Sequence, residues 1–528
     1  MRTAALVYAG SATELALQPL AGGLSAYERA LGFAASLPDF AGALVLEGPQ
    51  ALPAGPFRRE RREAWTPAAI LESAESFAAS FGEGEGAIEA LVLLRADEPF
   101  LDRALAAKML ANFRRYRADY SFADGFPLGL AAEILHPRAL PALRLLADRH
   151  PLEPERGWLF ALVQKDINSF DIETEISPKD LRDLRLALAC DTKRNFLLVE
   201  RLLAAGVADA ETALAVIPER LELQRTLPAF VQVQVAGGCP QACALCPYPL
   251  VGGEVLARRD FMPTRRYAAL MEAVAAFSGD AVIDLSLWGE PSLHPDLEGL
   301  VEATLSHPGL CLIVETSGIG WKPATLERLA ARWGSAAAQG EGRAVSPRLH
   351  WVVSLDASDP ELYARLRGPG FEEAHATAEL LLGLFPRSAH VQTLRAVDNE
   401  AALEDFWRGW KKRTDNVIVQ KYSTFAGLLP PRKVTDLSPL TRRPCWHLKR
   451  DLAILLDGTV PLFRDCARNE IVLGKLFPEG PADGAADGAA DGGAEAIGQR
   501  LAEAWAAGES HHRLHIEGDY PPPCADCD

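Results

Sequence analysis

The sequence has no apolar run long enough to cross a bilayer, so no membrane-spanning helix is expected. Its first residues, MRTAALVYAGSATELALQPL, place Glu14 within the apolar segment and lack the pattern of a signal peptide. We therefore expect a cytoplasmic protein with no membrane partner.

Positive charge is scarce as well. Lys and Arg number 54 against 71 Asp and Glu, which gives a formal net charge of −17. A surface that binds nucleic-acid phosphates needs clustered Lys and Arg. The composition therefore argues against a nucleic-acid partner.

Cysteines are few and unevenly distributed, with nine among 528 residues. Seven of them lie in two groups, within residues 239–246 and 445–527. The other two, Cys190 and Cys311, lie in apolar runs and are expected to be inert core residues. Because a cytosolic chain rarely carries a disulfide framework, the two groups favour metal binding or redox chemistry.

The chain is longer than one hydrophobic core usually supports, so several domains are expected. Residues 1–215 alternate buried runs such as AALVYAG with amphipathic stretches, which is typical of an α/β domain. Residues 225–440 repeat this alternation six times and predict a parallel sheet partly closed into a (βα)6 barrel, with chemistry at the carboxyl ends of the strands. Residues 441–528 form a small cysteine-rich region with a hairpin around DGT and a disordered insertion at about 478–495.

Three cysteines, Cys239, Cys243 and Cys246, follow the alternating run VQVQV in a C-x3-C-x2-C arrangement. Three thiols beside Gly and Pro are hard to explain as core packing. A structural zinc site is one alternative, although zinc normally takes four ligands; a disulfide relay is another and would leave one thiol over. Three thiolates also suit three corners of a cubane iron–sulfur cluster, whose fourth iron then stays open to an exogenous ligand.

This loop resembles the cysteine motif of the radical S-adenosylmethionine (radical SAM) superfamily. Three later segments, LSLWGEPSLHPD, ETSG and VSLDASDPELYARLRGPG, resemble the same superfamily in the same order. The resemblance implies a catalytic [4Fe–4S] cluster on the three cysteines, with S-adenosyl-L-methionine (SAM) at its open iron. The residues that it implies for SAM binding are Gly289, Glu290, Pro291, Ser317, Ser354, Asp356 and Arg395. Two positions depart from the usual pattern: Trp288 replaces a common Gly, and Leu245 replaces a common aromatic residue, with Tyr248 nearby.

Cys445, Cys466, Cys524 and Cys527 form the second group, in which the last two make a C-x2-C pair. Four thiolates suit zinc as well as an iron–sulfur cluster. The surrounding segments resemble the SPASM or twitch extension that follows radical SAM barrels, which implies one auxiliary [4Fe–4S] cluster. The histidines of SHHRLH, within residues 510–515, are expected to lie on the surface at a helix end.

Segments of roughly the first 210 residues, including LVLLRADEPF and LALACDTKRNF, resemble nucleotidyltransferases of the cytidylyltransferase type. The resemblance implies that Asp97 and Asp191 hold a divalent metal, because hard cations prefer carboxylate ligands. The loop that would bind triphosphate departs from that family, since no Lys or Arg stands between Arg2 and Arg29. We therefore expect a degenerate binding or docking module in this region.

The three regions together resemble the spiro-SPASM family. We expect a radical SAM enzyme that cleaves SAM reductively and modifies a peptide or a sugar-derived substrate, with a flavodoxin- or ferredoxin-type electron donor. Two alternatives stand beside it: a nucleotidyltransferase with a redox-sensing iron–sulfur module, and a non-catalytic zinc-binding scaffold.

Overall fold

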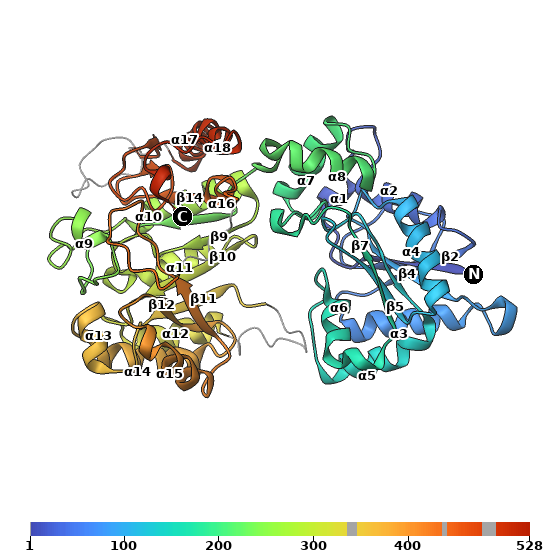
Figure 1. Ribbon diagram of the computed structural model, residues 1–528, viewed down its shortest axis with the longest axis horizontal. Coiled ribbons are helices and arrows are strands. Elements are labelled where there is room, and N and C mark those ends of the chain that lie inside the picture. The colour runs from blue at the N-terminus through green and yellow to red at the C-terminus, as the bar shows by residue number, and fades with distance from the viewer. Residues whose placement is uncertain (1, 335–345, 436–440, 478–492, 528) are drawn as a thin grey trace. The chain divides into compact units, whose positions relative to one another are not determined.

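The structure is a computed structural model that divides into two compact units, here called the amino-terminal unit (Met1–Thr226) and the carboxyl-terminal unit (Leu227–Asp528) (Figure 1). The residues that it describes are 2–334, 346–435, 441–477 and 493–527. Most of the insertion expected at about 478–495 lies outside these residues. Both units are mixed α/β structures built on largely parallel sheets, which confirms the expected fold class.

The amino-terminal unit contains one seven-stranded sheet in the order β3-β2-β1-β4-β6-β5-β7, in which β6 is antiparallel to both of its neighbours. Its strands are β1 (Thr3–Ala9), β2 (Phe40–Glu47), β3 (Arg58–Arg61), β4 (Ala90–Arg95), β5 (Tyr120–Asp124), β6 (Glu133–Leu135) and β7 (Ile172–Ile176). Its α-helices are α1 (Glu14–Leu17), α2 (Ala26–Ala35), α3 (Pro67–Ala79), α4 (Arg103–Tyr116), α5 (Leu140–Arg149), α6 (Trp158–Val163), α7 (Lys193–Ala204) and α8 (Ala210–Glu219).

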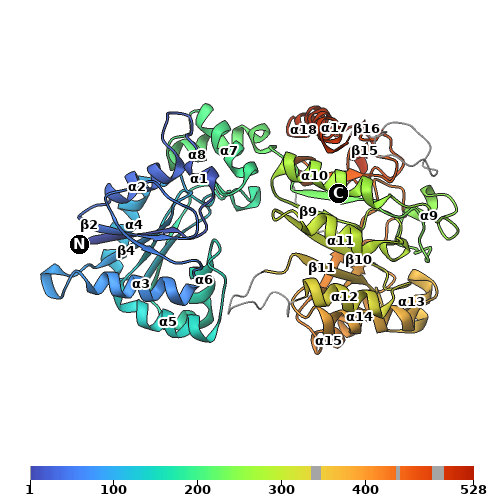
Figure 2. The ribbon, with the colours of Figure 1, turned by 180° about the vertical axis from the view of Figure 1, so that it is seen from behind.

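Strand β1 is buried on both faces because its alternate side chains meet helices on opposite sides of the sheet (Figure 2). Leu6 belongs to a hydrophobic cluster that contains residues of α3, α5 and α6. Its neighbour Val7 belongs to a second cluster, formed with residues of α2 and α4. This arrangement explains why the strand is a continuous apolar run in the sequence.

The carboxyl-terminal unit contains a second seven-stranded sheet, in the order β13-β12-β11-β10-β9-β8-β14, and all of its strand pairs are parallel. A separate antiparallel pair joins β15 and β16. The strands are β8 (Phe230–Val233), β9 (Ala281–Asp284), β10 (Leu310–Thr316), β11 (Leu349–Ser354), β12 (Ala389–Arg395), β13 (Val417–Lys421), β14 (Asp451–Ile454), β15 (Thr459–Pro461) and β16 (Val472–Lys475). The helices are α9 (Tyr248–Val251), α10 (Thr264–Ser278), α11 (Leu297–Leu305), α12 (Pro323–Trp333), α13 (Pro360–Arg367), α14 (Phe371–Leu384), α15 (Glu400–Lys411), α16 (Trp446–Arg450), α17 (Gly493–Ala507) and α18 (Glu509–Ile516).

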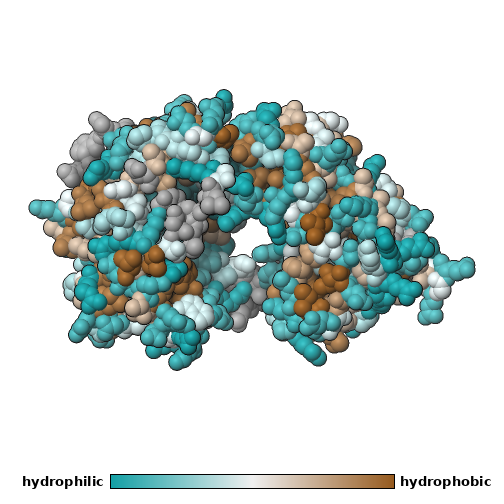
Figure 3. Space-filling model, viewed as in Figure 1, coloured by the Kyte–Doolittle hydropathy of each residue, from teal (hydrophilic) through white to brown (hydrophobic). Residues whose placement is uncertain are grey.

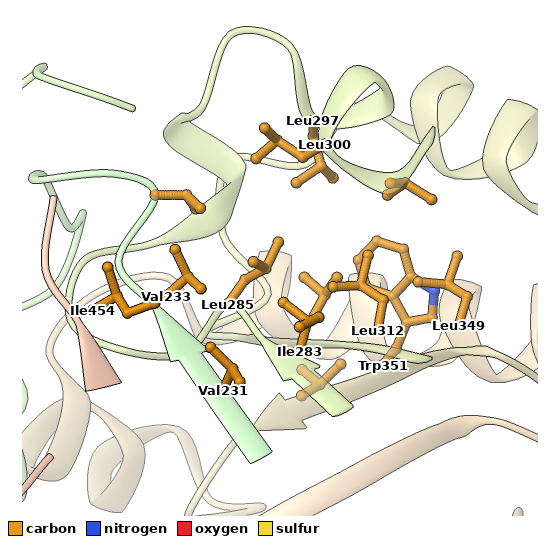
Figure 4. Close-up of a cluster of buried hydrophobic side chains, with 14 of the residues drawn as sticks. Val231, Val233, Ile283, Leu285, Leu297, Leu300, Leu312, Leu349, Trp351 and Ile454 are labelled. Atoms are coloured by element: carbon orange, nitrogen blue, oxygen red, sulfur yellow. The ribbon is translucent and has the colours of Figure 1, made fainter. Parts of the chain in front are cut away.

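Strand β8 shows how the sequence separates the core of this unit from its polar interior. Val231 and Val233 pack in one hydrophobic cluster with residues of the neighbouring strands and of α11 (Figure 4). The intervening Gln232 is also buried, at 2% exposure, and its amide donates a hydrogen bond to Asp284 on β9 at 3.2 Å. Because side chains alternate along a strand, the valines pack into the core while the glutamine joins a polar network on the other face.

The region expected to be a separate cysteine-rich domain contributes β14 to the main sheet, where it pairs with β8. The DGT turn forms as predicted, since Gly458 adopts a φ of +84° and its N–H bonds the carbonyl of Leu455 at 2.8 Å. The two flanking runs meet at the turn, where the N–H of Leu455 bonds the carbonyl of Thr459 at 2.9 Å, and away from the turn β14 pairs with β8 and β15 pairs with β16. Strand β14 adds one more parallel strand at the edge of the main sheet, where its backbone groups pair with those of β8.

Hydrophilic residues cover most of the face shown in Figure 3, and hydrophobic residues form separate patches there. Among the described residues, no helix combines the length and the apolar character that crossing a bilayer requires.

Candidate functional site

One cavity lies at the carboxyl ends of the parallel strands in the carboxyl-terminal unit. Cys239, Cys243 and Cys246 line one part of its wall. Residues at or just after the ends of β9 to β13 line the rest, among them Gly289, Glu290, Ser317, Ser354 and Asp356. The structure thus gathers eight of the ten residues that the sequence predicts for the barrel site around one space.

The cysteine loop is fixed from both sides by backbone hydrogen bonds. The N–H of Cys239 bonds the carbonyl of Val255 at 2.9 Å, and the N–H of Ala244 bonds the carbonyl of Leu366 at 2.8 Å. The side-chain amide of Gln241 donates to the hydroxyl of Tyr363 at 3.1 Å. The first contact ties the loop to the segment after α9, and the other two tie it to α13, so the backbone of the loop is held in place.

Glu290 ties the Gly-Glu-Pro segment to the end of β10. It is 2% exposed, and its carboxylate accepts hydrogen bonds from the Thr316 hydroxyl and from the Ser317 backbone N–H, the latter at 2.8 Å. Burial raises the pKa of this carboxyl, although the hydrogen bonds act in the opposite direction. Glu290 therefore positions the backbone at the cavity rim.

A polar network crosses the strand ends on the inner face of the sheet. The amide of Gln392 donates to Glu315 at 2.7 Å and to the Ser354 hydroxyl at 3.1 Å. Burial, reinforced by the negative charge of Glu315, raises the pKa of nearby Asp284 to about 6. Sequence reasoning found Ser354 but missed Glu315, which lies in the ETSG segment, and Gln392, which lies in the middle of β12 and is paired with Ser354 by the strand register.

Asp356 and Arg367 form a buried ion pair at 2.6 Å beside the cysteine loop. The second oxygen of Asp356 accepts the backbone N–H of Leu394 at 2.7 Å, so both oxygens are held by protein groups. Arg367 also bonds Gln241 at 3.3 Å. The pair therefore links the ends of β11 and β12 to the cysteine loop.

Replacing Asp356 with asparagine is expected to lower the free energy of unfolding by about 3 kcal/mol, because it leaves a buried guanidinium without its counter-ion. Asparagine tolerates the left-handed backbone that Asp356 adopts, with φ of 63°, so the change isolates the charge. Urea unfolding followed by tryptophan fluorescence measures the effect. Glu404→Gln, in an exposed pair with Arg408, is the control and is expected to cost less than about 0.5 kcal/mol; equal costs would contradict the prediction.

Trp288, which departs from the common glycine, lines the cavity together with Tyr248. Their rings are nearly parallel, with centroids 5.9 Å apart and planes at 7°. Tyr248 donates its hydroxyl hydrogen to the carbonyl of Gly237 at 2.8 Å. The pair provides an aromatic surface beside the cysteines, where Leu245 lacks one.

The chemistry of the three thiols fits a metal cluster. Burial raises the pKa of Cys239 and Cys246 to about 12, and it raises the pKa of Cys243 as well. Metal coordination deprotonates a thiol outright, and the guanidinium groups of Arg367 and Arg464 favour the thiolate of Cys246. Within the described ranges, no three His, Cys, Asp or Glu side chains are arranged to hold one metal ion. Ligands of a cubane bind separate irons, so a cluster does not require that arrangement.

The second group of cysteines also comes together. Cys466 and Cys524 are buried in one small cluster, and Cys445 and Cys527 pack against it. Arg442 donates to the carbonyls of Cys524 and Cys527, the latter at 2.7 Å, which fixes the C-x2-C turn. Four thiols from three separate chain segments thus share one site, which could hold a fully ligated cluster.

A second cavity beside these cysteines shares part of its wall with the first. The residues that line both are Gln420, Lys421, Ser423 and Arg464. Arg464 precedes Cys466 by two residues and its guanidinium also affects the pKa of Asp284 in the barrel. The two cysteine sites are therefore neighbours across a wall that contains two cations.

The prediction of surface histidines in SHHRLH is wrong for His512 and His515, which are 2% and 3% exposed. His515 lines the second cavity and packs edge-on against Tyr520 at 4.7 Å. Neither of its ring nitrogens has a hydrogen-bond partner among the residues described. The two histidines are buried because one face of α18 packs against α16 and α17, a contact that the sequence alone does not reveal.

Two predicted residues lie elsewhere. Pro291 is buried and does not line the cavity. Arg395 pairs with Glu400 at 2.7 Å and lines a separate cavity. Gln420 and Lys421 line both this cavity and the cavity of the barrel site.

In the amino-terminal unit, Asp97 and Asp191 do come together, and both contact Arg156. Cys190 is fully buried there, whereas Cys311 is only half-buried on β10.

Comparison with solved structures gives low overall similarity. BtrN in complex with AdoMet and 2-DOIA matches with a TM-score of 0.36 and 16% identity over 57% of this chain and 94% of its own. Streptococcus suis SuiB bound to S-adenosylmethionine has a TM-score of 0.36 and 14% identity over 50% of this chain and 68% of its own. A cytidylyltransferase from Leptospira borgpetersenii has a TM-score of 0.34 and 16% identity over 42% of this chain and 96% of its own.

No protein-family model matches the chain. An uncharacterized protein of Treponema pallidum (strain Nichols) is 33% identical over 379 residues, which are 70% of this chain and 97% of that protein. A second uncharacterized protein of the same organism is 46% identical over 77 residues, or 14% of this chain and 35% of that protein. The extent of the first match shows that the chain belongs to the same family as this Treponema pallidum protein.

Proposed function

We propose that this chain is a radical SAM enzyme that reductively cleaves SAM and modifies a peptide or sugar-derived substrate. One observation carries the proposal: three cysteines from a single loop line a cavity together with polar groups from the carboxyl ends of successive parallel strands. This arrangement supplies three thiolates and leaves the remaining ligands of a cubane to a bound molecule. When bound to Cys239, Cys243 and Cys246, a [4Fe–4S] cluster would supply the electron that splits a carbon–sulfur bond of SAM.

The protein groups around the cavity bind and orient SAM. Glu290 holds the Gly-Glu-Pro backbone in place at the cavity rim, where this backbone would bind the ammonium group of SAM. Ser317 and Ser354 would bind the ribose, and the Trp288–Tyr248 pair would offer a stacking surface for the adenine. The Asp356–Arg367 pair holds the cysteine loop to the strand ends.

Gly289 tests the backbone part of this site. Its φ is +72°, and an added Cβ would lie 2.0 Å from the carbonyl oxygen of Ala236. Gly289→Ala is therefore expected to displace the rim and weaken SAM binding at least about tenfold, a change of about 1.4 kcal/mol, as measured by equilibrium dialysis. Gly253→Ala is the matched control, because Gly253 has a φ of +71° but open space around its Cβ. Equal affinities in the two variants would contradict the proposed role.

We further propose that residues 441–528 hold one auxiliary [4Fe–4S] cluster through Cys445, Cys466, Cys524 and Cys527. Complete thiolate ligation suits electron transfer rather than substrate binding. The wall shared with the barrel cavity supports such a role, because it brings the two cysteine sites into neighbouring positions. An external flavodoxin- or ferredoxin-type protein would supply electrons to the enzyme.

The experiment that tests the function is anaerobic reconstitution followed by reduction with dithionite. Electron paramagnetic resonance should show a reduced cluster whose signal changes when SAM is added, and 5′-deoxyadenosine should form. Deuterium-labelled peptides and sugar derivatives would then identify the substrate by label transfer to 5′-deoxyadenosine. Stoichiometric zinc in place of iron and sulfide, with no 5′-deoxyadenosine, would overturn the proposal in favour of a zinc scaffold.

A further inference from the structure

Three carboxylates in the amino-terminal unit surround one guanidinium group. Arg156, just before α6, contacts Asp97 at 2.7 Å and Asp191 at 3.3 Å, and it also pairs with Glu98. Asp97 and Glu98 directly follow β4 and are 3% and 7% exposed. Hard carboxylate ligands gathered at strand ends are the usual setting for a divalent cation. Here the cation is a side chain of the protein.

The carboxylates are held firmly enough to make this a fixed site. The backbone carbonyl of Asp97 accepts the N–H of Cys190 at 2.8 Å, which joins β4 to the segment before α7. Asn195, on α7, donates its amide to the free oxygen of Asp191 at 2.8 Å. Glu98 accepts the backbone N–H of Arg95 at 3.1 Å. Arg156 already lies among these carboxylates, so a small ion entering the site would have to displace it.

The charges already present oppose such an exchange. Three carboxylates face two guanidinium groups, since Arg95 lies 3.9 Å from Asp97 as well. Two of the three negative charges are therefore already balanced by guanidinium groups of the protein. A divalent cation would gain little attraction here and would be repelled by both arginines.

We propose that Arg156 takes the place of a divalent cation between Asp97 and Asp191, so that the amino-terminal unit binds no metal there and cannot perform metal-dependent nucleotidyl transfer. The resemblance to cytidylyltransferases implies a metal at these two residues. Their carboxylates do not fit a metal here, because Arg156 already contacts both of them. The guanidinium stabilises the loop after β4 in the way a bound ion would, because each of its three nitrogens contacts a different carboxylate and no cofactor is needed. This proposal is independent of the radical SAM assignment.

The test measures Mn²⁺ binding to the full-length protein. Free Mn²⁺ is quantified by its electron paramagnetic resonance signal at room temperature, where iron–sulfur clusters give no signal. The wild-type protein and the Asp97→Asn variant are expected to bind the same amount of Mn²⁺. Arg156→Met keeps an unbranched apolar stem and removes the guanidinium group, so it should create one site at least tenfold tighter than any in the wild type. Adding Asp97→Asn to Arg156→Met should abolish that site.

Two outcomes would overturn the proposal. One is a wild-type Mn²⁺ site that is lost in Asp97→Asn; the other is a folded Arg156→Met protein, verified by circular dichroism, that binds no more Mn²⁺ than the wild type. If the Arg156→Met variant does not fold, thermal unfolding of the wild-type protein with and without Mg²⁺ tests the proposal instead. Mg²⁺ should leave the melting temperature of the wild type unchanged, because a ligand stabilises only a native state that binds it; a rise that Asp97→Asn removes would refute the inference.

Discussion

Cys246→Ala is expected to abolish the reductive formation of 5′-deoxyadenosine. Cys246 lines the barrel cavity with Cys239 and Cys243, and three thiolates are the minimum that leaves a cubane with a single open iron. Removing one of them leaves the cluster with two protein ligands, so the open iron is no longer the only labile corner. The measurement is 5′-deoxyadenosine formed per chain under anaerobic reduction, quantified by mass spectrometry.

Cys311→Ala is the control for this experiment. Cys311 belongs to the same unit and lies on β10, but it does not line the cavity. Its replacement is expected to leave 5′-deoxyadenosine formation at the wild-type level. Undiminished formation in the Cys246 variant, with cluster content intact, would refute the assignment of this loop.

The double replacement Cys524→Ala and Cys527→Ala is expected to remove one cluster and leave the other. Iron should fall from about eight to about four atoms per chain, because each [4Fe–4S] cluster carries four irons. The barrel loop should keep its cluster, since its anchors, including Val255 and Leu366, lie outside the second cysteine group. The SAM-induced change in the resonance of the barrel cluster should therefore survive.

A control for the number of thiols removed is the double replacement of Cys190 and Cys311, the two cysteines outside both groups. It should retain about eight irons per chain. Equal iron in the two double variants would show that the carboxyl-terminal cysteines hold no cluster. Loss of all iron from the first variant would instead show that the two sites do not assemble independently.

Spacing along the chain was enough to predict the cysteine loop, because its three ligands lie within eight residues. Glu290, Ser317 and Ser354 were predicted from the resemblance to the radical SAM superfamily, and they meet because parallel strands bring their carboxyl ends to one edge. Glu315 and Gln392 lie within β10 and β12, and their hydrogen-bonded contact with each other depends on the register of the strands.

Contacts between distant segments could not be predicted in this way. The burial of His515 depends on the packing of α18 against α16 and α17, and the place of β14 depends on an open edge at β8. Arg156 lies 59 residues from Asp97 and 35 from Asp191, and nothing in its local sequence marks it as their partner. The Trp288–Tyr248 stack likewise joins the start of α9 to the loop after β9.

The sequence by itself determined the α/β alternation of both units and the two groups of cysteines, because hydrophobic period and ligand spacing are local properties of a chain. Tertiary structure alone decided which cation fills the carboxylate cluster, which strand completes the main sheet, and how the two cysteine sites share a wall. Those outcomes depend on which segments far apart in the chain pack together, and that choice is made by the burial and charge balance of the whole unit.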